Sequence, residues 1–301
     1  MTEVEKLLQE AQELRSIIER QASEIAVVNA ELAETNKGVV ALYAELDDRA
    51  EQLRQATELK SRFLSYMSHE FRTPLGSIVS LSRVLMDHMD GPLTDEQERQ
   101  VRLIRGSAEE LIEMVNDLLD LAKVEAGRIS ISPEWFEMVD LFSALRGMFK
   151  PIISKQSVDL IFEEPKNVPM LFTDHKKLSQ ILRNYISNAL KFTQKGSVRV
   201  SAECKDSEMV IFSVADTGIG IAKEHQKELF NDFVQVDSPV QKHLRGTGLG
   251  LSLSKKLAEL LGGNVGIEGD LGKGSIFSVT VPVRLPGYTG NENREESKYA
   301  G

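Results

Sequence analysis

A heptad repeat over the first 60 residues constrains the fold of this chain more than any other feature of the sequence. One apolar column runs through Val4, Ala11, Ile18, Ile25, Leu32, Val39, Leu46 and Leu53, and a second, three residues further on, through Leu7, Leu14, Gln21, Val28, Thr35, Leu42, Arg49 and Ala56. Two columns at this spacing form the a/d seam of a left-handed coiled coil. The sequence therefore predicts a long helix that pairs with a second copy of the chain.

This coiled coil has two possible functions. It can be an inert rod that only holds a homodimer together, or a signal-input helix that receives a signal from an upstream sensor protein. The heptad register extends through Lys60, Phe63 and Met67, which places His69 two residues after an a position, on the outer face of the helix. An outward histidine could be reached by another domain, so both interpretations stay open.

Residues 68–75 read Ser-His-Glu-Phe-Arg-Thr-Pro-Leu, on about two turns of a predicted helix. Pro74 removes a backbone donor, which predicts either the end of this helix or a kink in it. The apolar spacing from residue 75 to residue 86 favours a helix that continues.

A second helix is expected after a turn at residues 90–92. Thr94 or Asp95 can cap its N-terminus, and the helix should end near Gly127. The two helices would form an antiparallel hairpin, and two hairpins from two chains would form a four-helix bundle.

Beyond residues 130–133 the sequence pattern becomes mixed α and β, which predicts an α+β sandwich. Strands are expected at residues 158–162, 197–202, 209–216, 264–268 and 275–283, and helices at residues 139–154, 174–192, 225–230 and 249–261. Cys204 lies in an expected strand, where a small buried side chain is more common than a nucleophile.

Asn184, Asn188 and Lys191 lie at positions i, i+4 and i+7, so they share one face of the helix expected at residues 174–192. An amide oxygen suits Mg²⁺, which prefers oxygen ligands, and a lysine supplies a positive charge for phosphates. The same residues could also form a solvated helix face, and the spacing alone does not separate these alternatives.

Two glycine-rich segments follow this helix. Asp216 ends an apolar strand and precedes Gly218 and Gly220, so its carboxylate could accept a hydrogen bond from an adenine amino group or belong to an ordinary strand-end turn. Residues 246–250, Gly-Thr-Gly-Leu-Gly, open a predicted helix and would present free N–H groups to an anion. A polar stretch rather than a strand precedes them, which suits a lid over phosphates better than a dinucleotide fingerprint.

In this order and spacing, residues 68–75, 184–193, 216–220 and 246–251 resemble the H, N, G1 and G2 boxes of the two-component sensor histidine kinases. The resemblance extends from about Leu59 to Val283. It implies a protein-histidine kinase with ATP and Mg²⁺ as cofactors, which phosphorylates His69 and passes the phosphoryl group to an aspartate in the receiver domain of a response regulator. It also implies a homodimer.

The resemblance further implies roles for single residues. Glu70 would accept a hydrogen bond from Nδ1–H of His69. Thr73 would help to remove phosphate from the regulator, although its hydroxyl could simply bond the helix backbone before Pro74. Asn188 would be the Mg²⁺ ligand. The nucleotide-binding residues would be Asn184, Asn188, Lys191, Phe192, Asp216, Gly218, Gly220, Phe230, Phe233, Gly246, Thr247, Gly248, Leu249 and Gly250, of which Phe230 and Phe233 match the F box.

Four segments are expected along the chain. Residues 1–60 would be the coiled-coil dimerisation and signal-input helix, and residues 61–128 the helical-hairpin dimerisation and histidine phosphotransfer domain. Residues 129–285 would be an ATP-binding catalytic domain of the GHKL type, and residues 286–301 a polar, disordered tail.

Composition narrows the range of partners. The chain has 36 Lys and Arg against 46 Asp and Glu, and this net charge of −10 disfavours nucleic acid as the main partner. Cys204 is the only cysteine, which rules out a disulfide within one chain and fits the reducing cytosol. No run of about 18 apolar residues is present, so we expect no membrane span and a cytoplasmic location.

Two other classes of function stay open. The first is another ATPase of the same superfamily, or an anti-sigma-like serine kinase, which would need no phosphorylated histidine. Acid-labile, alkali-stable phosphate on the protein would exclude this class. The second is a non-catalytic scaffold built on the coiled coil, which a nucleotide-binding assay would exclude.

Overall fold

The computed structural model describes residues 3–89, 91–153, 157–204, 208–235 and 247–288. Gly246 and the tail from residue 289 onward lie outside these residues, so the predictions made for them stay predictions. The chain divides into two units, Met1–Lys60 and Ser61–Gly301, and each is described by itself. Among the described helices, none is both long and apolar enough to span a bilayer.

The first unit belongs to helix α1, Glu3–Met86. Residues 1–60 contain no proline and a single glycine, Gly38, so nothing in this segment interrupts a helix. The predicted seam lies open along the single chain, because Ile18, Ile25, Val28 and Leu32 each expose more than half of their surface. A continuous apolar stripe in contact with water favours pairing with another helix.

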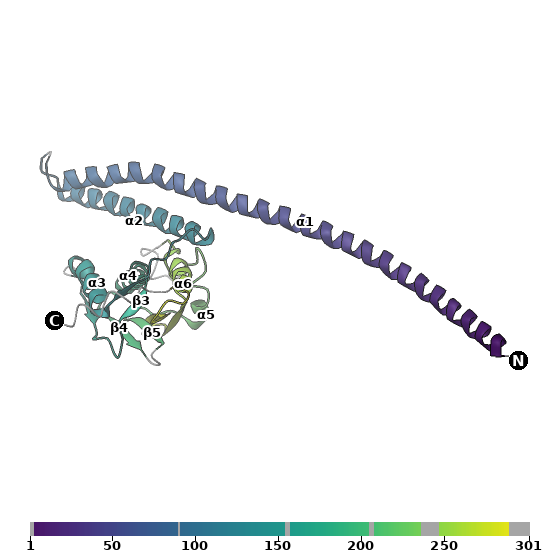
Figure 1. The fold of residues 1–301 in the computed structure, drawn as a ribbon. Helices are drawn as coiled ribbons and strands as arrows, with labels where there is room; N and C mark the ends of the chain where they lie inside the picture. The colour runs from purple at the N-terminus through teal and green to yellow at the C-terminus, as the bar shows by residue number, and fades with distance from the viewer. Residues whose placement is uncertain (1–2, 90, 154–156, 205–207, 236–246, 289–301) are drawn as a thin grey trace, which may run out of the picture. The chain divides into compact units, whose positions relative to one another are not determined.

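In the second unit, the remainder of α1 and helix α2, Asp95–Glu125, form the expected hairpin (Figure 1). Helix α1 continues through Pro74 to Met86, as the apolar spacing favoured. Thr94 caps α2 in a capping box, in which its hydroxyl accepts from the Gln97 N–H and the Gln97 side chain accepts from the Thr94 N–H. Arg72 donates to Asn116 Oδ1 over 2.8 Å and joins the two helices.

The face that α1 buries in the hairpin differs from the seam extrapolated through Phe63 and Met67. Ser68, Leu75 and Ser82 are buried at intervals of seven residues, one position out of that register, whereas Phe63 is exposed. The buried face is the one that packs on α2 of the same chain, so the exposed Phe63 stays available to the seam predicted with a second copy. Several apolar side chains of the hairpin remain exposed: Phe71, Ile78, Leu81, Leu103, Ile104 and Leu111.

The rest of the second unit is a two-layer α+β domain. Its five-stranded sheet has the order β2 (Val158–Phe162), β4 (Gly196–Cys204), β5 (Met209–Asp216), β7 (Gly274–Pro282) and β6 (Asn264–Asp270). Strands β2 and β4 are parallel, and the other neighbours are antiparallel. Helices α3 (Met138–Ile153), α4 (His175–Phe192) and α6 (Gly250–Leu260) lie on one face of the sheet (Figure 1).

The hydrophobic core lies between the sheet and these helices. Tyr185 and Ile186 of α4, Leu257 of α6 and Phe212 of β5 are almost completely buried. Cys204 is buried in β4, as expected. The predicted fold class, a long helix and helical hairpin followed by an α+β domain, is confirmed for the single chain.

Three short elements were missed or misplaced by the sequence patterns. Strands β1 (Glu134–Phe136) and β3 (Leu171–Thr173) pair antiparallel in a separate small sheet that was not expected. Three residues are too few for alternation to be recognised. The helix expected at residues 225–230 is the shorter α5, Lys223–Gln226.

Candidate phosphoacceptor and nucleotide site

His69 and Glu70 lie on the part of α1 that belongs to the hairpin, and both side chains are exposed. Among the described residues, no hydrogen bond joins these two side chains, so the contact expected between them requires the imidazole to rotate toward Glu70. Thr73 Oγ1 donates to the His69 carbonyl oxygen over 3.3 Å, which is the backbone bond considered for it. His69 therefore stands in solvent and is accessible to a phosphoryl donor.

Asn184 and Asn188 face the same side of α4 and touch each other. Asn188 Nδ2 donates to Asn184 Oδ1 over 3.3 Å, and Asn184 Nδ2 donates to Ser254 Oγ of α6 over 2.8 Å. Lys191 Nζ lies 5.9 Å from the centre of the Phe192 ring, one turn further along α4. The helix starts at Asp174, whose carboxylate accepts from the N–H groups of Lys176 and Lys177, and this cap fixes where the helical face begins.

Asp216 is the last residue of β5 and is buried. Burial raises the pKa of its carboxyl group, while hydrogen bonds from the Gly218 and Ser275 backbone N–H groups lower it. The Gly218 bond is 2.8 Å long and ends on Oδ1. A buried acceptor held in this way can accept a hydrogen bond from a donor such as an adenine amino group.

The loop after Asp216 packs closely on its neighbours. Gly220 has a φ of 67°, and a Cβ there would collide with the Asp270 carbonyl oxygen, so a glycine is required on both counts. The Ile219 N–H donates to the Phe192 carbonyl oxygen over 3.4 Å, and the Gly272 N–H donates to the Ile219 carbonyl oxygen over 2.7 Å. The loop thus connects the end of α4 to the β6–β7 turn.

The glycine turn that precedes α6 is described from Thr247 onward. Thr247 Oγ1 accepts from the Leu249 N–H over 3.2 Å, and the Gly248 carbonyl oxygen accepts from the Phe233 N–H over 3.2 Å. The side chain of Leu249 is buried, so only its backbone could reach a ligand. Gly250 begins α6 directly opposite Asn184.

The two aromatic residues of the expected F box differ in their surroundings. Phe230 packs against the core, whereas Phe233 is 64% exposed and has a positive φ of 62°. The polar stretch for which a lid was predicted, residues 237–245, lies outside the described residues, so that prediction stays a prediction.

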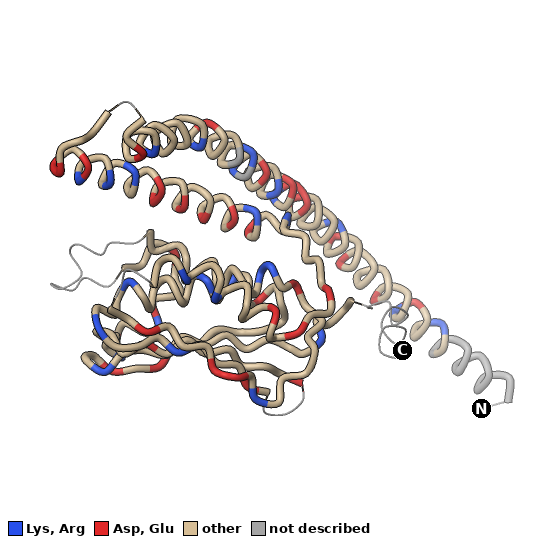
Figure 2. Tube along the Cα trace, turned by 90° about the vertical axis from the view of Figure 1, so that its left-hand side faces the viewer, with Lys and Arg blue, Asp and Glu red and all other residues tan. Residues whose placement is uncertain are grey.

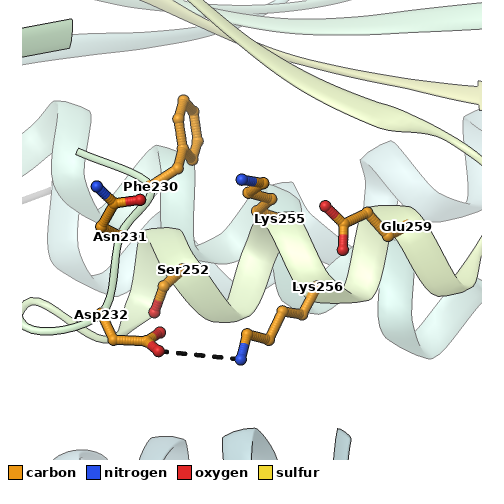
Figure 3. A pocket seen from close by; sticks show the side chains of 7 residues that line it. All are labelled: Phe230, Asn231, Asp232, Ser252, Lys255, Lys256 and Glu259. Atoms are coloured by element: carbon orange, nitrogen blue, oxygen red, sulfur yellow. Dashed lines mark ion pairs between the residues drawn. The ribbon is translucent and has the colours of Figure 1, made fainter. Parts of the chain in front are cut away.

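A pocket of about 300 Å³ lies beside the nucleotide motifs, between the turn after Phe230 and the outer face of α6 (Figure 3). Lys256 Nζ lies 3.9 Å from Asp232 Oδ2 on the rim and 2.9 Å from Glu125 Oε1 of α2. Neither Asp216 nor the Asn184–Asn188 pair lines this pocket, so we do not assign the nucleotide to it.

The helical hairpin contacts the α+β domain through polar side chains that the sequence did not single out. Gln180 Nε2 donates to Asp120 Oδ2 over 3.0 Å. Burial, with smaller contributions from the charges of Glu113 and Asp120, raises the pKa of Asp117 to about 6. Along α2, Arg99, Arg102 and Arg105 are followed by an acidic stretch that contains Asp117, and Figure 2 shows the basic and the acidic residues in separate parts of this helix.

The residues present suit a nucleotide-borne Mg²⁺ better than a metal held by protein alone. Among the described residues, no group of three or more His, Cys, Asp or Glu side chains could hold a metal ion. Mg²⁺ in nucleotide sites is commonly bound by few protein oxygens together with substrate phosphates. Asn188 Oδ1 fits that requirement, because the hydrogen bond to Asn184 uses the nitrogen of the Asn188 amide and leaves its oxygen available.

Two families match this chain. Residues 59–127 match the His Kinase A (phospho-acceptor) domain, and residues 173–285 match the histidine kinase-, DNA gyrase B- and HSP90-like ATPases. Over 239 residues the chain is 35% identical to the autoinducer 2 sensor kinase/phosphatase LuxQ of Vibrio parahaemolyticus, which covers 77% of this chain and 28% of LuxQ. Over 240 residues it is 37% identical to the circadian input-output histidine kinase CikA of Synechococcus elongatus, which covers 79% of this chain and 32% of CikA.

Among solved structures, full-length ShkA in complex with AMPPNP matches with a TM-score of 0.60 and 33% identity, over 73% of this chain and 45% of that one. The chain therefore belongs to the two-component sensor histidine kinases, and the two domains it carries are those of a protein-histidine kinase. It spans 28–32% of the length of the two relatives named above.

Proposed function

We propose that this protein autophosphorylates His69 from Mg-ATP and passes the phosphoryl group to an aspartate of a response regulator. One observation carries the proposal: an exposed histidine on a phosphoacceptor helix accompanies a buried Asp216 and a linked Asn184–Asn188 pair in an ATPase fold. Neither the rival ATPases nor a scaffold would need both parts. Family membership supports ATP as the phosphoryl donor.

In the proposed reaction, Nε2 of neutral His69 attacks the γ-phosphorus of ATP. The N–P bond forms as the bond from that phosphorus to the bridging oxygen breaks, and ADP leaves. Glu70 accepts a hydrogen bond from Nδ1–H and stabilises the positive charge that the imidazole gains. Adjacent helix positions do not normally face each other, so the imidazole must rotate toward Glu70. Mg²⁺ offsets negative charge on the phosphates when it is bound.

The nucleotide would be held by the groups around α4 and the two glycine segments. Asp216 would accept a hydrogen bond from the adenine amino group, and Lys191 would lie near the phosphates. The backbone N–H groups at the start of α6 would contribute to phosphate binding, as helix N-termini do for anions. A receiver aspartate would then attack the phosphorus of phosphohistidine, which returns His69 to its neutral form.

We also propose that the protein acts as a homodimer. The exposed seam of the first unit and the exposed apolar side chains of the hairpin support this assembly, because both would be covered by a second copy. The coiled coil is the proposed route by which an upstream sensor protein would act on the hairpin.

A second activity, removal of phosphate from the regulator, is favoured by the place of Thr73. Its hydroxyl lies one turn from His69 on an exposed face, and the similar protein LuxQ carries the name sensor kinase/phosphatase. A hydroxyl in this position could orient the attacking water.

Incubation with γ-labelled ATP tests the kinase proposal. We expect label that is acid-labile and alkali-stable, lost in His69→Gln and kept in His88→Gln, which changes another exposed histidine of the hairpin. Nucleotide binding should survive in His69→Gln. Normal labelling of that variant would refute the proposed phosphoacceptor. In a separate step, incubation of the labelled wild-type protein with a panel of receiver domains would identify the regulator.

A further inference from the structure

Ser254 of α6 closes a chain of hydrogen bonds that leads to Asn188. Asn188 Nδ2 donates to Asn184 Oδ1 over 3.3 Å, and Asn184 Nδ2 donates to Ser254 Oγ over 2.8 Å. Ser254 Oγ in turn donates to the Gly250 carbonyl oxygen over 2.8 Å. The chain connects α4, which carries the proposed Mg²⁺ ligand, to the first turn of α6.

The direction of these bonds is set at Ser254. A carbonyl oxygen can only accept, and a serine hydroxyl has one proton, so Ser254 gives that proton to Gly250. Its lone pair must then meet a donor, which is Nδ2 of Asn184. Asn184 consequently turns its oxygen toward Asn188, and Asn188 must present its nitrogen. The oxygen of Asn188 is left outside the chain and accepts no hydrogen bond from the described residues.

Packing holds this arrangement in place. Ser254 is only 2% exposed, so bulk water does not compete for its hydroxyl. A Cβ at position 250 would lie 2.5 Å from Asn184 Oδ1 and 3.1 Å from Nδ2. Gly250 is therefore required for space beside the Asn184 amide rather than for an unusual backbone angle.

We propose that Ser254 is a positioning residue, which holds the Asn188 amide with its oxygen available to the Mg²⁺ of bound MgATP. This inference rests on the proposed function, because it needs Asn188 to be the metal ligand. Ser254 touches neither metal nor nucleotide. It acts through Asn184, as groups behind a metal ligand commonly orient it.

Without the hydroxyl, Asn184 loses its acceptor and the Asn188 amide is free to rotate. Either end of the Asn188 amide can then face the metal, and only one end can bind it. Removing such supporting groups typically weakens metal binding by about 10- to 100-fold. The loss should appear in the Mg²⁺-dependent part of nucleotide affinity and leave the metal-free part unchanged.

The test is Ser254→Ala in the full chain, titrated with a fluorescent, non-hydrolysable ATP analogue in EDTA and across a series of Mg²⁺ concentrations. We expect EDTA affinity within about twofold of wild type and a Mg²⁺ half-saturation concentration about tenfold higher or more. Ser252→Ala is the matched control, because Ser252 is equally buried on α6, but among the described residues its hydroxyl bonds only the Leu249 carbonyl oxygen, over 3.0 Å. Ser254→Thr keeps a hydroxyl and should restore the Mg²⁺ response.

Equal Mg²⁺ responses in wild type and Ser254→Ala would overturn the role of Ser254 while the proposed function stands. Equal losses of affinity with and without Mg²⁺ would also overturn it, because they would indicate a merely structural serine. A wild-type protein without Mg²⁺-dependent nucleotide binding would overturn the proposed function and this inference together.

Discussion

Replacing Tyr185 with phenylalanine should stabilise the α+β domain. Tyr185 lies on α4 between the two proposed ligand-binding asparagines, is completely buried, and its hydroxyl has no hydrogen-bond partner among the described residues. Burial raises the pKa of this hydroxyl. The ring lies 5.5 Å from that of Phe277 on β7, and phenylalanine keeps this contact.

The size of the effect follows from the unpaired hydroxyl. A buried polar group without a partner costs about 1–3 kcal/mol. The small void left by one oxygen offsets part of this gain, by up to about 1 kcal/mol. A net gain of about 1–2 kcal/mol corresponds to a rise in Tm of about 2–8 °C for a domain of roughly 150–250 residues.

The only tryptophan of the chain provides the assay. Trp135 lies on β1, and its ring is 5.2 Å from that of Phe172, so its fluorescence should report unfolding of this domain. Tyr288→Phe makes the same chemical change at an exposed site and should leave Tm unchanged. Tyr185→Leu removes the ring as well and should lower Tm. A lower Tm for Tyr185→Phe would show that the hydroxyl has a partner, such as a buried water, and would refute this reasoning.

Four further predictions concern function and pH. Asp216→Asn should weaken nucleotide binding by about 1–3 kcal/mol in a fluorescence titration, because an adenine donor would lose its acceptor, and unchanged affinity would contradict the adenine assignment. Thr73→Ala should leave autophosphorylation intact and slow dephosphorylation of the regulator roughly 10- to 100-fold, measured with ADP present; equal rates would return Thr73 to a backbone-bonding role. Burial raises the pKa of Asp117 to about 6, so the folded protein binds the proton of the Asp117 carboxyl group more tightly than the unfolded chain does. The free energy of unfolding should therefore fall as pH rises from about 4 to about 6. Thermal unfolding at several pH values tests this: Asp117→Asn should raise Tm at pH 7.5 by an amount equivalent to about 1–2 kcal/mol, and raise it little at pH 4.5. If the variant and the wild type show the same dependence of Tm on pH, Asp117 does not cause this loss of stability. Deleting residues 25–31 preserves the heptad phase and should keep the kinase-to-phosphatase ratio. Deleting residues 25–28 rotates the seam and should shift this ratio, while both variants stay dimeric by light scattering. If the two deletions behave alike, the coiled coil only dimerises the chain.

Much of the fold could be predicted from the sequence because its elements have strong periodic patterns. Strands at residues 158–162 and 209–216 match β2 and β5, and the cap at Thr94 marks the start of α2. The continuation of α1 past Pro74 was also correctly favoured. Where the pattern was three residues long, as in β1 and β3, local sequence carried too little information.

The face of α1 that packs on α2 shows a different limit. The heptad pattern predicts the face toward a second copy and carries no information about the face toward α2. In the hairpin the face toward α2 carries Ser68, Leu75 and Ser82, and two of these three residues are polar. A face with so few apolar residues gives no signal in a hydrophobic repeat, so its one-residue offset could be found only from the three-dimensional packing.

The motif residues themselves were found from the sequence, but the contacts between motifs were not. Asn184 and Gly250 belong to segments 66 positions apart, and each was considered first as a ligand contact. In the structure, Gly250 leaves the space that the Asn184 amide occupies, and Ser254, one turn further on α6, holds that amide. Ser254 resembles any other small residue on an amphipathic helix, so no spacing rule would select it.

These contacts change how the glycine segments should be understood. A glycine at the start of α6 is commonly explained by the approach of a phosphate to the backbone. Here a Cβ at Gly250 would meet the Asn184 side chain before any ligand is considered, and a Cβ at Gly274 would meet the backbone carbonyl of Asp216. Gly250 therefore leaves space for the Asn184 side chain, and Gly274 leaves space for the backbone of Asp216. It follows that a substitution at Gly250 should disturb Asn184 even without nucleotide, so its effect on ligand affinity cannot be assigned to lost phosphate contacts alone.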